Sequence, residues 1–339
     1  MTTHVSDAER VDVATLTLNP SLDLSTSVDS IEPWRKLRCE TAQLDPGGGG
    51  INVARVVQTL GGRSLSVAAL GGHVGSEVAA SLRRQGVPLR RVRTSHGTRQ
   101  NFAVTERSTG RQFRFIQGGD PMTPAEWRRC LEVTATAARA ARCVVASGSL
   151  PLGVPDDFTV QLADRIAPLQ VPLIVDTSGP ALLASILAPI ALVKPSVNEL
   201  QSLVDRVLHD MEDYECAARE LLAVGRCGAI IVSLGKDGAL VVPRDREATV
   251  VRAPEVPVRS TIGAGDSMVG AIALMLSRRA TLIDAVRFGV AAGTAAVTRF
   301  GTALCAADDV TMLAAQVTTH GLRQPVSLGT LGAQGHENG

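Results

Sequence analysis

The chain has 339 residues, of which 45% are hydrophobic and 20% charged, and its formal net charge is +1. This length and composition allow a large buried core, either in one large α/β domain or in two domains. A near-zero charge, no basic run and only 3% aromatic residues argue against nucleic acid and anionic membranes as partners.

The ends of the chain and its cysteines indicate a cytoplasmic protein. Residues 1–12 are polar and acidic, without the pattern of a signal peptide, and we expect them to be flexible. No apolar run is long enough to span a bilayer. The six cysteines form neither a C-x-x-C pair nor a zinc-type cluster, which favours reduced thiols.

The first predicted strand, 13–19, ends at Asn19-Pro20 and is followed by Asp23. Ligands of parallel α/β sheets bind at the carboxyl ends of the strands, so an acid at this point can hold sugar hydroxyls. Capping or solvating a turn is an equally good interpretation of Asp23.

Alternating segments at about 24–46 and 99–117 predict a small sheet inserted into the larger domain. Such a sheet could serve as a lid over a substrate, and its cations suit a substrate phosphate. Exposed lid strands also need cover, which self-association commonly provides, so we expect a homodimer. The lid cations are Lys36, Arg38, Arg99 and Arg114.

Between these segments, the glycines at 47–50 lead through Asn52 into a helix expected at 53–60. Backbone that lies close to a ligand favours residues without side chains, and Asn52 offers both a donor and an acceptor. A flexible linker is the alternative, but linkers rarely run directly into an amphipathic helix. We therefore favour a binding loop.

The second half of the chain alternates between strands and helices. Short apolar strands between helices predict a parallel sheet covered on both faces. The expected strands are 143–146, 172–175, 191–193 and 229–234, and the expected helices include 158–167 and 285–299. The turn 235–238 could contact nucleotide phosphates, although a plain hairpin turn is the more common use of such a sequence. We expect a disordered tail over 319–339.

The best candidate for a catalytic centre is the stretch 260–267, which contains Gly263-Ala264-Gly265-Asp266 and enters an apolar helix at 268–276. The first N–H groups of a helix have no intrahelical partner, so this junction can hold a phosphate-like anion. Asp266 could take a proton from a hydroxyl, a combination that suggests a kinase. A helix acid favoured only by the dipole is the alternative.

Together, these motifs resemble the PfkB branch of the ribokinase family of carbohydrate kinases. The carrying segments are 15–23, 47–55, 147–151, 193–195, 233–235 and 263–267, within a likeness that runs from about 13 to 309. Within the branch, the segments most similar to the minor bacterial 6-phosphofructokinases are 36–39, 47–55, 98–101 and 286–296. The resemblance implies a ribokinase-like, mostly parallel sheet flanked by helices over 13–318, with a β-sheet lid that forms a dimer clasp. The implied activity is ATP-dependent phosphorylation of fructose 6-phosphate at its 1-hydroxyl.

The resemblance also implies roles for individual residues. Asp266 would be the base, with an anion hole formed by Gly263, Ala264 and Gly265. The sugar phosphate would be bound by Asp23, Gly48, Gly49, Gly50, Asn52, Arg99, Arg114, Ser147 and Ser149. The ATP site would include Lys36 reaching from the partner subunit, Lys194, Ser196, Ser233, Gly235, Lys236, Gly238, Val290 and Thr294. Glu199 would act on Mg²⁺ through water. A potassium ion would involve Ser260, Ile262, Ala296, Arg299, Gly301 and Ala303, largely through carbonyl groups.

The sequence departs from the family pattern at two places. Ser196 stands where the family's Asn-x-x-Glu motif begins, so we expect either a different magnesium shell or substitution by Asn198. Arg299 and Ala303 stand where the similar kinases have Asn and Arg, which puts the potassium dependence in doubt.

Three other functions are the alternatives to this one. Kinases of the branch that act on tagatose 6-phosphate or fructose 1-phosphate usually carry Lys at the position of Gly49, which favours fructose 6-phosphate. A catalytically silent regulator that binds ATP and sugar is the alternative from another class. A dinucleotide-dependent oxidoreductase is excluded, since G-x-G-x-x-G does not follow the first strand.

Overall fold

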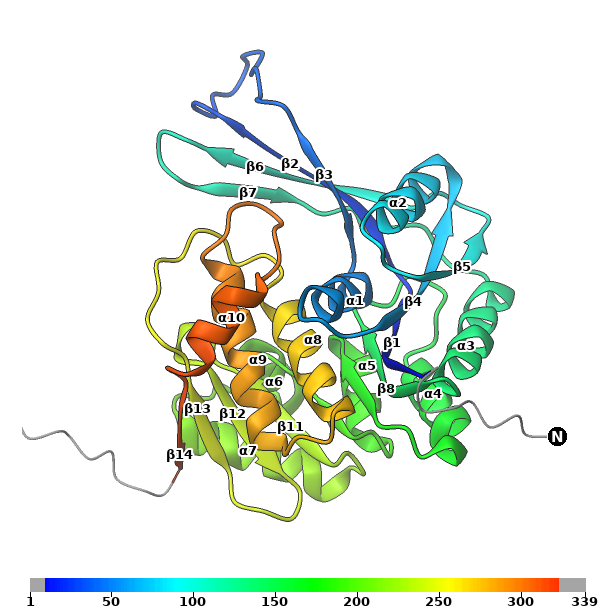
Figure 1. Cartoon of the computed structure of the whole chain (residues 1–339), viewed down its shortest axis with the longest axis vertical. Helices are drawn as coiled ribbons and strands as arrows, with labels where there is room; N and C mark the ends of the chain where they lie inside the picture. Colours follow the sequence, from blue (N-terminus) through cyan, green and yellow to red (C-terminus); the bar gives the residue numbers. More distant parts are fainter. Residues whose placement is uncertain (1–9, 323–339) are drawn as a thin grey trace, which may run out of the picture.

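Two β-sheets organise the computed structural model, which describes residues 10–322 (Figure 1). The larger sheet has ten strands, in the spatial order β14 (Thr318–Gly321), β13 (Thr249–Arg252), β12 (Ala239–Pro243), β11 (Ala229–Ser233), β10 (Leu192–Val193), β9 (Leu173–Asp176), β8 (Ala141–Ser147), β1 (Val11–Thr17), β4 (Ser64–Gly71) and β5 (Leu89–Thr94). The strands from β11 to β5 are parallel, and β12, β13 and β14 continue the sheet antiparallel.

Helices cover both faces of this sheet, as the short apolar strands require. One face is covered by α1 (Gly49–Thr59), α2 (Gly72–Arg84), α8 (Ala264–Ser277), α9 (Leu282–Val297) and α10 (Ala307–Ala314). The other face is covered by α3 (Pro124–Ala138), α4 (Phe158–Ile166), α5 (Gly179–Leu187), α6 (Val197–Val204) and α7 (Met211–Val224). Two short 3₁₀ helices are η1 (Ala167–Leu169) and η2 (Gly235–Asp237). The predicted α/β architecture is therefore confirmed.

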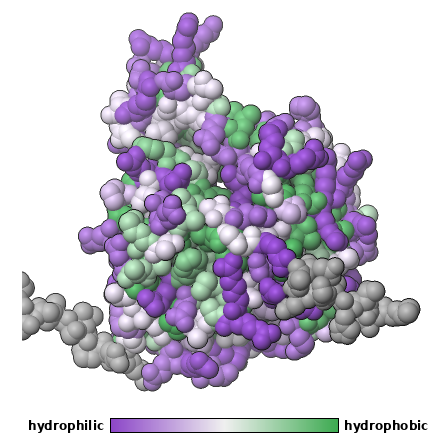
Figure 2. Space-filling model, in the orientation of Figure 1, coloured by the Kyte–Doolittle hydropathy of each residue, from purple (hydrophilic) through white to green (hydrophobic). Residues whose placement is uncertain are grey.

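The smaller sheet forms the expected lid, which projects beyond the body of the molecule (Figure 1). Its strands, in spatial order, are β3 (Gln43–Gly47), β2 (Ser21–Val28), β6 (Arg99–Glu106) and β7 (Gln112–Phe115). Since successive side chains of a strand point to opposite faces, the register divides the lid into two surfaces. Asp23 pairs with Asp45 and Asn101 on one face, and Leu24 pairs with Leu44 and Phe102 on the other. Hydrophilic residues cover the tip of the lid (Figure 2).

The order of the strands places the candidate site. β1 lies between β8 and β4, so the chain leaves β1 at a point where successive connections run to opposite sides of the sheet. Ligands of open α/β sheets bind at such a switch point, outside the carboxyl ends of the strands. Ser147, Asp176 and Lys194 lie at or just after the carboxyl ends of β8, β9 and β10.

Two expected boundaries need correction. β1 begins at Val11, inside the stretch expected to be flexible, because its backbone pairs with β8 from Val11 onward. β14 occupies 318–321, where we expected the tail to begin, because it pairs antiparallel with β13. The remaining parts of those two predictions, residues 1–9 and 323–339, lie outside the described residues. Within 10–322, no helix combines the length and hydropathy needed to cross a bilayer.

Candidate active site

Asp266 lies in the first turn of α8, immediately after a glycine-rich turn. Gly263 is the N-cap of this helix and has a φ of 75°, a left-handed conformation that glycine adopts without strain. The N–H groups of Ala264, Gly265 and Asp266 begin the helix and therefore lack intrahelical acceptors. The turn thus presents a set of donors at the positive end of the helix dipole, next to a carboxylate.

Asn52 holds the carboxylate of Asp266. Its Nδ2 donates a hydrogen bond of 2.8 Å to Asp266 Oδ2, although the two residues are 214 positions apart. Burial raises the pKa of Asp266 to about 6; Asp176 and Asp23 add to the rise, while Asn52 and Lys194 oppose it. A carboxylate with this pKa is mostly ionised at pH 7 and can still accept a proton efficiently.

Lys194 supplies a buried positive charge beside the glycine turn. Its Nζ lies 3.1 Å from Asp176 Oδ1 and 3.8 Å from the place where a Cβ of Gly265 would stand. Burial alone would lower the pKa of Lys194, but Asp176, Glu199 and Asp266 together raise it above its usual value. Lys194 is one of the residues predicted for the ATP site, whereas Asp176 is not among the predicted site residues. Their ion pair lies beside the glycine turn that precedes Asp266.

Asp23 lies within β2 rather than in a turn, so the interpretation of this residue as a turn cap is wrong. Its Oδ1 accepts hydrogen bonds from Ser21 Oγ (2.7 Å) and Asn101 Nδ2 (2.8 Å). These bonds fix the carboxylate on the lid face that also carries Asp45. Asn101 is not among the predicted site residues, because only the parallel pairing of β2 with β6 brings it to Asp23.

The glycine loop packs directly against the ends of β1 and β8, so it is not a flexible linker. Gly48 has a φ of 107°, and Gly49 and Gly50 form the start of α1. A Cβ at Gly49 would collide with Ser147 Oγ and would lie 2.8 Å from the N atom of Gly148. A lysine side chain therefore cannot be placed at Gly49 without moving the loop. Farther along the same loop after β8, Ser149 Oγ accepts a hydrogen bond from Asn19 Nδ2 (3.1 Å).

The two lid arginines differ in their contacts. Arg99 donates to the carbonyl groups of Gln117 (2.6 Å) and Asn19 (3.1 Å), and burial lowers its pKa against the opposing effect of Asp23. Arg114 on β7 is exposed, and its register with Ala103 places it on the lid face of Asp23. Arg99 therefore also anchors the lid, whereas Arg114 presents its charge to solvent on the side of the site.

The residues expected to bind ATP lie near the carboxyl ends of β10 and β11. Ser196 is the N-cap of α6, and its side chain and that of Glu199 form a reciprocal capping box, with Ser196 N and Oγ donating to Glu199 Oε2 at 2.7 and 2.8 Å. Ser196 also pairs with Ser233 across the sheet. The tight turn after β11 follows, with positive φ values at Gly235 (61°) and Gly238 (98°) and an exposed Lys236.

Two further ATP candidates belong to α9. Val290 and Thr294 are buried, and Thr294 Oγ1 donates to the carbonyl of Val290 (2.8 Å). Between them, Gly293 approaches Ala264 closely: a Cβ would lie 3.2 Å from the Ala264 carbonyl. Val290 and Thr294 therefore flank the surface of α9 that contacts the glycine turn. Lys36, in contrast, is exposed. It belongs to the segment that joins β2 to β3, which forms the tip of the lid (Figure 1).

The structure brings the two halves of the expected potassium loop together. Ser260 Oγ donates to the Gly301 carbonyl (2.8 Å) and accepts from the N–H of Ile262 (3.2 Å). The Ser260 N–H donates to the carbonyl of Val297 (3.3 Å), the residue after Ala296. Arg299 extends to Asp309 at 3.8 Å, and the Ala303 N–H donates to the Phe300 carbonyl. Hydroxyl and carbonyl oxygens suit a hard cation, so this donor set fits a potassium ion.

The described residues contain no cluster of three or more His, Cys, Asp or Glu side chains arranged to hold a metal ion. Mg²⁺ in phosphoryl-transfer sites keeps several waters and is bound through one or two carboxylates and the substrate's phosphates. Glu199, whose charge raises the pKa of Lys194, is a carboxylate of the kind that binds such an ion through water.

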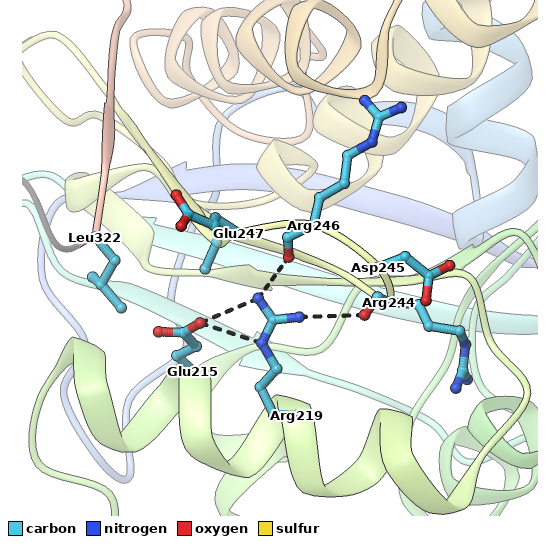
Figure 3. A pocket seen from close by; sticks show the side chains of 8 residues that line it. Glu215, Arg219, Arg244, Asp245, Arg246, Glu247 and Leu322 are labelled. Carbon is cyan, nitrogen blue, oxygen red and sulfur yellow. Dashed lines mark hydrogen bonds and ion pairs between the residues drawn. The ribbon is translucent and has the colours of Figure 1, made fainter.

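A hollow of about 440 Å³ lies elsewhere, between α7 and the turn that joins β12 to β13 (Figure 3). The Arg219 guanidinium in its wall donates to Glu215 and to the carbonyls of Pro243 and Arg246. Arg244 likewise donates to carbonyl groups, including that of Cys227. These arginines are therefore engaged in holding the turn, and the hollow has none of the chemistry found around Asp266.

Comparisons with known proteins agree with this geometry. The family model described as pfkB family carbohydrate kinase matches residues 16–309. The chain is 44% identical over 317 residues to the ATP-dependent 6-phosphofructokinase isozyme 2 of Mycobacterium tuberculosis, covering 93% of each chain.

Solved structures of Escherichia coli phosphofructokinase-2 are similar over nearly their whole length. The complex with potassium has a TM-score of 0.85 and the complex with fructose 6-phosphate a TM-score of 0.84. Each is 41% identical in sequence, and each match covers 90% of this chain and 99% of the other. The ribokinase-like arrangement expected from the sequence is therefore confirmed.

Proposed function

Because the chain belongs to the pfkB family of carbohydrate kinases, we propose that it transfers the γ-phosphoryl group of ATP to the 1-hydroxyl of fructose 6-phosphate. The products are fructose 1,6-bisphosphate and ADP. The observation that carries the proposal is the Asp266 carboxylate, which is oriented by Asn52 and directly follows the glycine turn that Lys194 adjoins.

In this reaction, Asp266 accepts the proton of the sugar's 1-hydroxyl while the oxygen of that hydroxyl forms a bond to the γ-phosphorus. The bond between that phosphorus and the bridging oxygen of ADP breaks, and ADP leaves with the electron pair. The N–H groups of Gly263, Ala264 and Gly265 and the ammonium of Lys194 stabilise the charge on the transferred group. Catalysis comes mainly from positioning and electrostatics, since phosphoryl transfer requires little covalent participation by the protein.

The lid and the glycine loop bind the sugar phosphate. Asp23 accepts hydrogen bonds from sugar hydroxyls. Asn52 and the Gly48–Gly50 backbone also contact the sugar, and Ser147 and Ser149 lie nearby. Arg99 and Arg114 bind the 6-phosphate. The lack of room for a side chain at Gly49 supports fructose 6-phosphate over fructose 1-phosphate and tagatose 6-phosphate, whose kinases usually carry Lys there.

ATP lies along the ends of β10 and β11 and the adjoining face of α9. The turn Gly235–Gly238 with Lys236 approaches its phosphates, Ser196 and Ser233 lie beside them, and Val290 and Thr294 line the base side. Glu199 would hold Mg²⁺ through water, and the ion would neutralise charge on the phosphates. The oxygens around Ser260, Ile262, Ala296 and Gly301 would hold potassium, beside the glycine turn but outside the reacting atoms.

The functional molecule is a homodimer joined through the lid. Leu44, Phe102 and Phe115 form a row across the outer face of the lid sheet and are partly exposed, at 48%, 37% and 58%. An apolar row on a projecting sheet favours burial against a second copy. In such a dimer, Lys36 at the tip reaches the partner's ATP site.

The test is ADP release from MgATP in the presence of fructose 6-phosphate, tagatose 6-phosphate, fructose 1-phosphate or ribose, each with and without potassium. We expect fructose 6-phosphate to give the highest kcat/KM, with potassium increasing it. A preference for another sugar would contradict the substrate assignment. ATP binding without ADP release from any sugar would indicate a silent regulator instead.

A further inference from the structure

A buried carboxylate on lid strand β3, Asp45, contacts its own strand, the nearby helix α1 and a loop that is 257 positions away in the sequence. Its Oδ2 accepts hydrogen bonds from Thr302 Oγ1 (2.7 Å) and Gln43 Nε2 (2.9 Å). Its Oδ1 lies 3.2 Å from an Nη atom of Arg55. Asp45 is therefore bonded to its own strand β3, to helix α1 and to the loop after α9.

Arg55 connects this carboxylate to the catalytic base. Its side chain is 14% exposed, and one Nη atom donates to the Pro46 carbonyl (3.1 Å) and to Asn52 Oδ1 (3.4 Å). An amide placed between a cation and a carboxylate is oriented by both, with its oxygen toward the cation and its NH₂ toward the carboxylate. Arg55 thus favours the orientation in which Asn52 donates to Asp266.

Thr302 forms the second connection, toward the glycine turn. It adjoins Gly301, whose carbonyl accepts from Ser260 Oγ, and Ser260 Oγ in turn accepts from the N–H of Ile262. Ile262 directly precedes Gly263, the N-cap of α8. One lid residue is therefore linked through two short paths to both parts of the catalytic centre, the base and the anion hole.

We infer that the Asp45–Arg55 pair is a positioning unit that links the lid to the orientation of Asn52 and of the glycine turn. A purely structural pair would not need to reach Asn52, Pro46 and Thr302 at once, and a buried ion pair adds little stability over apolar packing. The inference rests on the proposed function, because it assigns the pair a part in that reaction.

The test compares Arg55→Lys, Arg55→Met, Asp45→Asn and Thr302→Val with the wild type. We expect Arg55→Met to lower kcat about 10- to 100-fold, as misplacement of a catalytic group does, while KM for ATP changes less than about threefold. Arg55→Lys keeps the positive charge but lacks the planar guanidinium, so its kcat should lie between those of Arg55→Met and the wild type. Thr302→Val removes only the hydrogen bond from Thr302 to Asp45. It provides the test if the substitutions of Arg55 or Asp45 prevent folding.

The pH profile separates positioning from stability. The hydrogen bond from Asn52 lowers the pKa of Asp266, so its loss should move the acidic limb of kcat/KM to higher pH. The charged groups around Asp266, which are Asp23 on β2, Asp176 on β9 and Lys194 after β10, remain in every variant. Arg206→Met is the matched control, because it breaks an exposed 2.8 Å pair with Glu220 on α7, in the helical layer on the other face of the large sheet.

The inference would be overturned if Arg55→Lys and Thr302→Val lower only the melting temperature and leave both kcat and the acidic limb of kcat/KM unchanged. A second measurement does not depend on turnover. The free energy of unfolding is measured as a function of pH for each protein and for the same protein carrying Asp266→Asn, and the two values are subtracted. We expect that difference to begin changing at higher pH in the Arg55→Lys background, and coincidence with the wild-type curve would contradict the inference. A wild type that leaves fructose 6-phosphate unreacted contradicts only the proposed substrate, because this readout still reports on Asn52 and Asp266.

Discussion

The Asp266 carboxylate sets the pH dependence that we expect. Burial raises its pKa to about 6, and the base must be ionised to accept a proton. Activity should therefore be full above pH 7 and fall as the pH drops through about 6. The measurement is kcat/KM for fructose 6-phosphate between pH 5 and 8, and an acidic limb near pH 4 would contradict the raised pKa.

Asp266→Asn should trade activity for stability. The wild-type carboxylate is ionised at pH 7 despite its raised pKa, which costs folding free energy, and asparagine can still accept the hydrogen bond from Asn52. We expect the variant to be more stable by about 1–3 kcal/mol at pH 7, from the size of the pKa shift. The gain should shrink as the pH falls from about 6 toward 4, where the unfolded chain also binds the proton. Urea unfolding at several pH values measures this gain, and a gain that is independent of pH would contradict the raised pKa of Asp266.

The two lid arginines should respond differently to removal. Arg114→Ala should raise KM for fructose 6-phosphate about 10- to 100-fold, the equivalent of one charge-assisted hydrogen bond, with little change in KM for ATP or in melting temperature. Arg99→Ala should raise the same KM and also destabilise the lid, since Arg99 holds the carbonyls of Gln117 and Asn19. Equal effects of Arg114→Ala on both KM values would contradict the phosphate role.

At the level of elements, helix α6 explains the departure at Ser196. Serine is a strong N-cap, and here it completes a capping box with Glu199. Ser196→Ala should lower the free energy of unfolding by about 1 kcal/mol, whereas Ser196→Asn should lower it by only a few tenths. Thermal unfolding distinguishes the two variants, and equal losses would show that the cap contributes nothing.

The elements themselves were largely predictable, because their hydrophobic periods are local. The strand expected at 229–234 is β11, and the glycine turn before Asp266 was recognised from its position ahead of an apolar helix. The partners of the site residues were not predictable in this way. The bonds of Asp45 to Thr302 and of Asn52 to Asp266 span 257 and 214 positions, and only the folded topology joins them.

For the molecule as a whole, the exposed lid row predicts the assembly state. Phe115→Glu would place a charge in the dimer interface, so we expect it to convert the protein to monomers without unfolding it. Val224→Glu is the control, because Val224 is 73% exposed at the end of α7, far from the lid in sequence and fold. Sedimentation velocity measures both variants. A wild-type monomer, or a Phe115→Glu dimer, would contradict association through this face.

The most direct test of the proposed reaction is ³¹P NMR of wild type and Asp266→Asn incubated with MgATP and fructose 6-phosphate. We expect the wild type to form a second phosphate ester, at the 1-position, in equal amount to the ADP released. The variant should form it about 10²- to 10⁴-fold more slowly, the contribution of general-base catalysis, while binding fructose 6-phosphate with a similar Kd. No ester from the wild type would contradict the kinase function, and near-wild-type turnover in the variant would contradict Asp266 as the base.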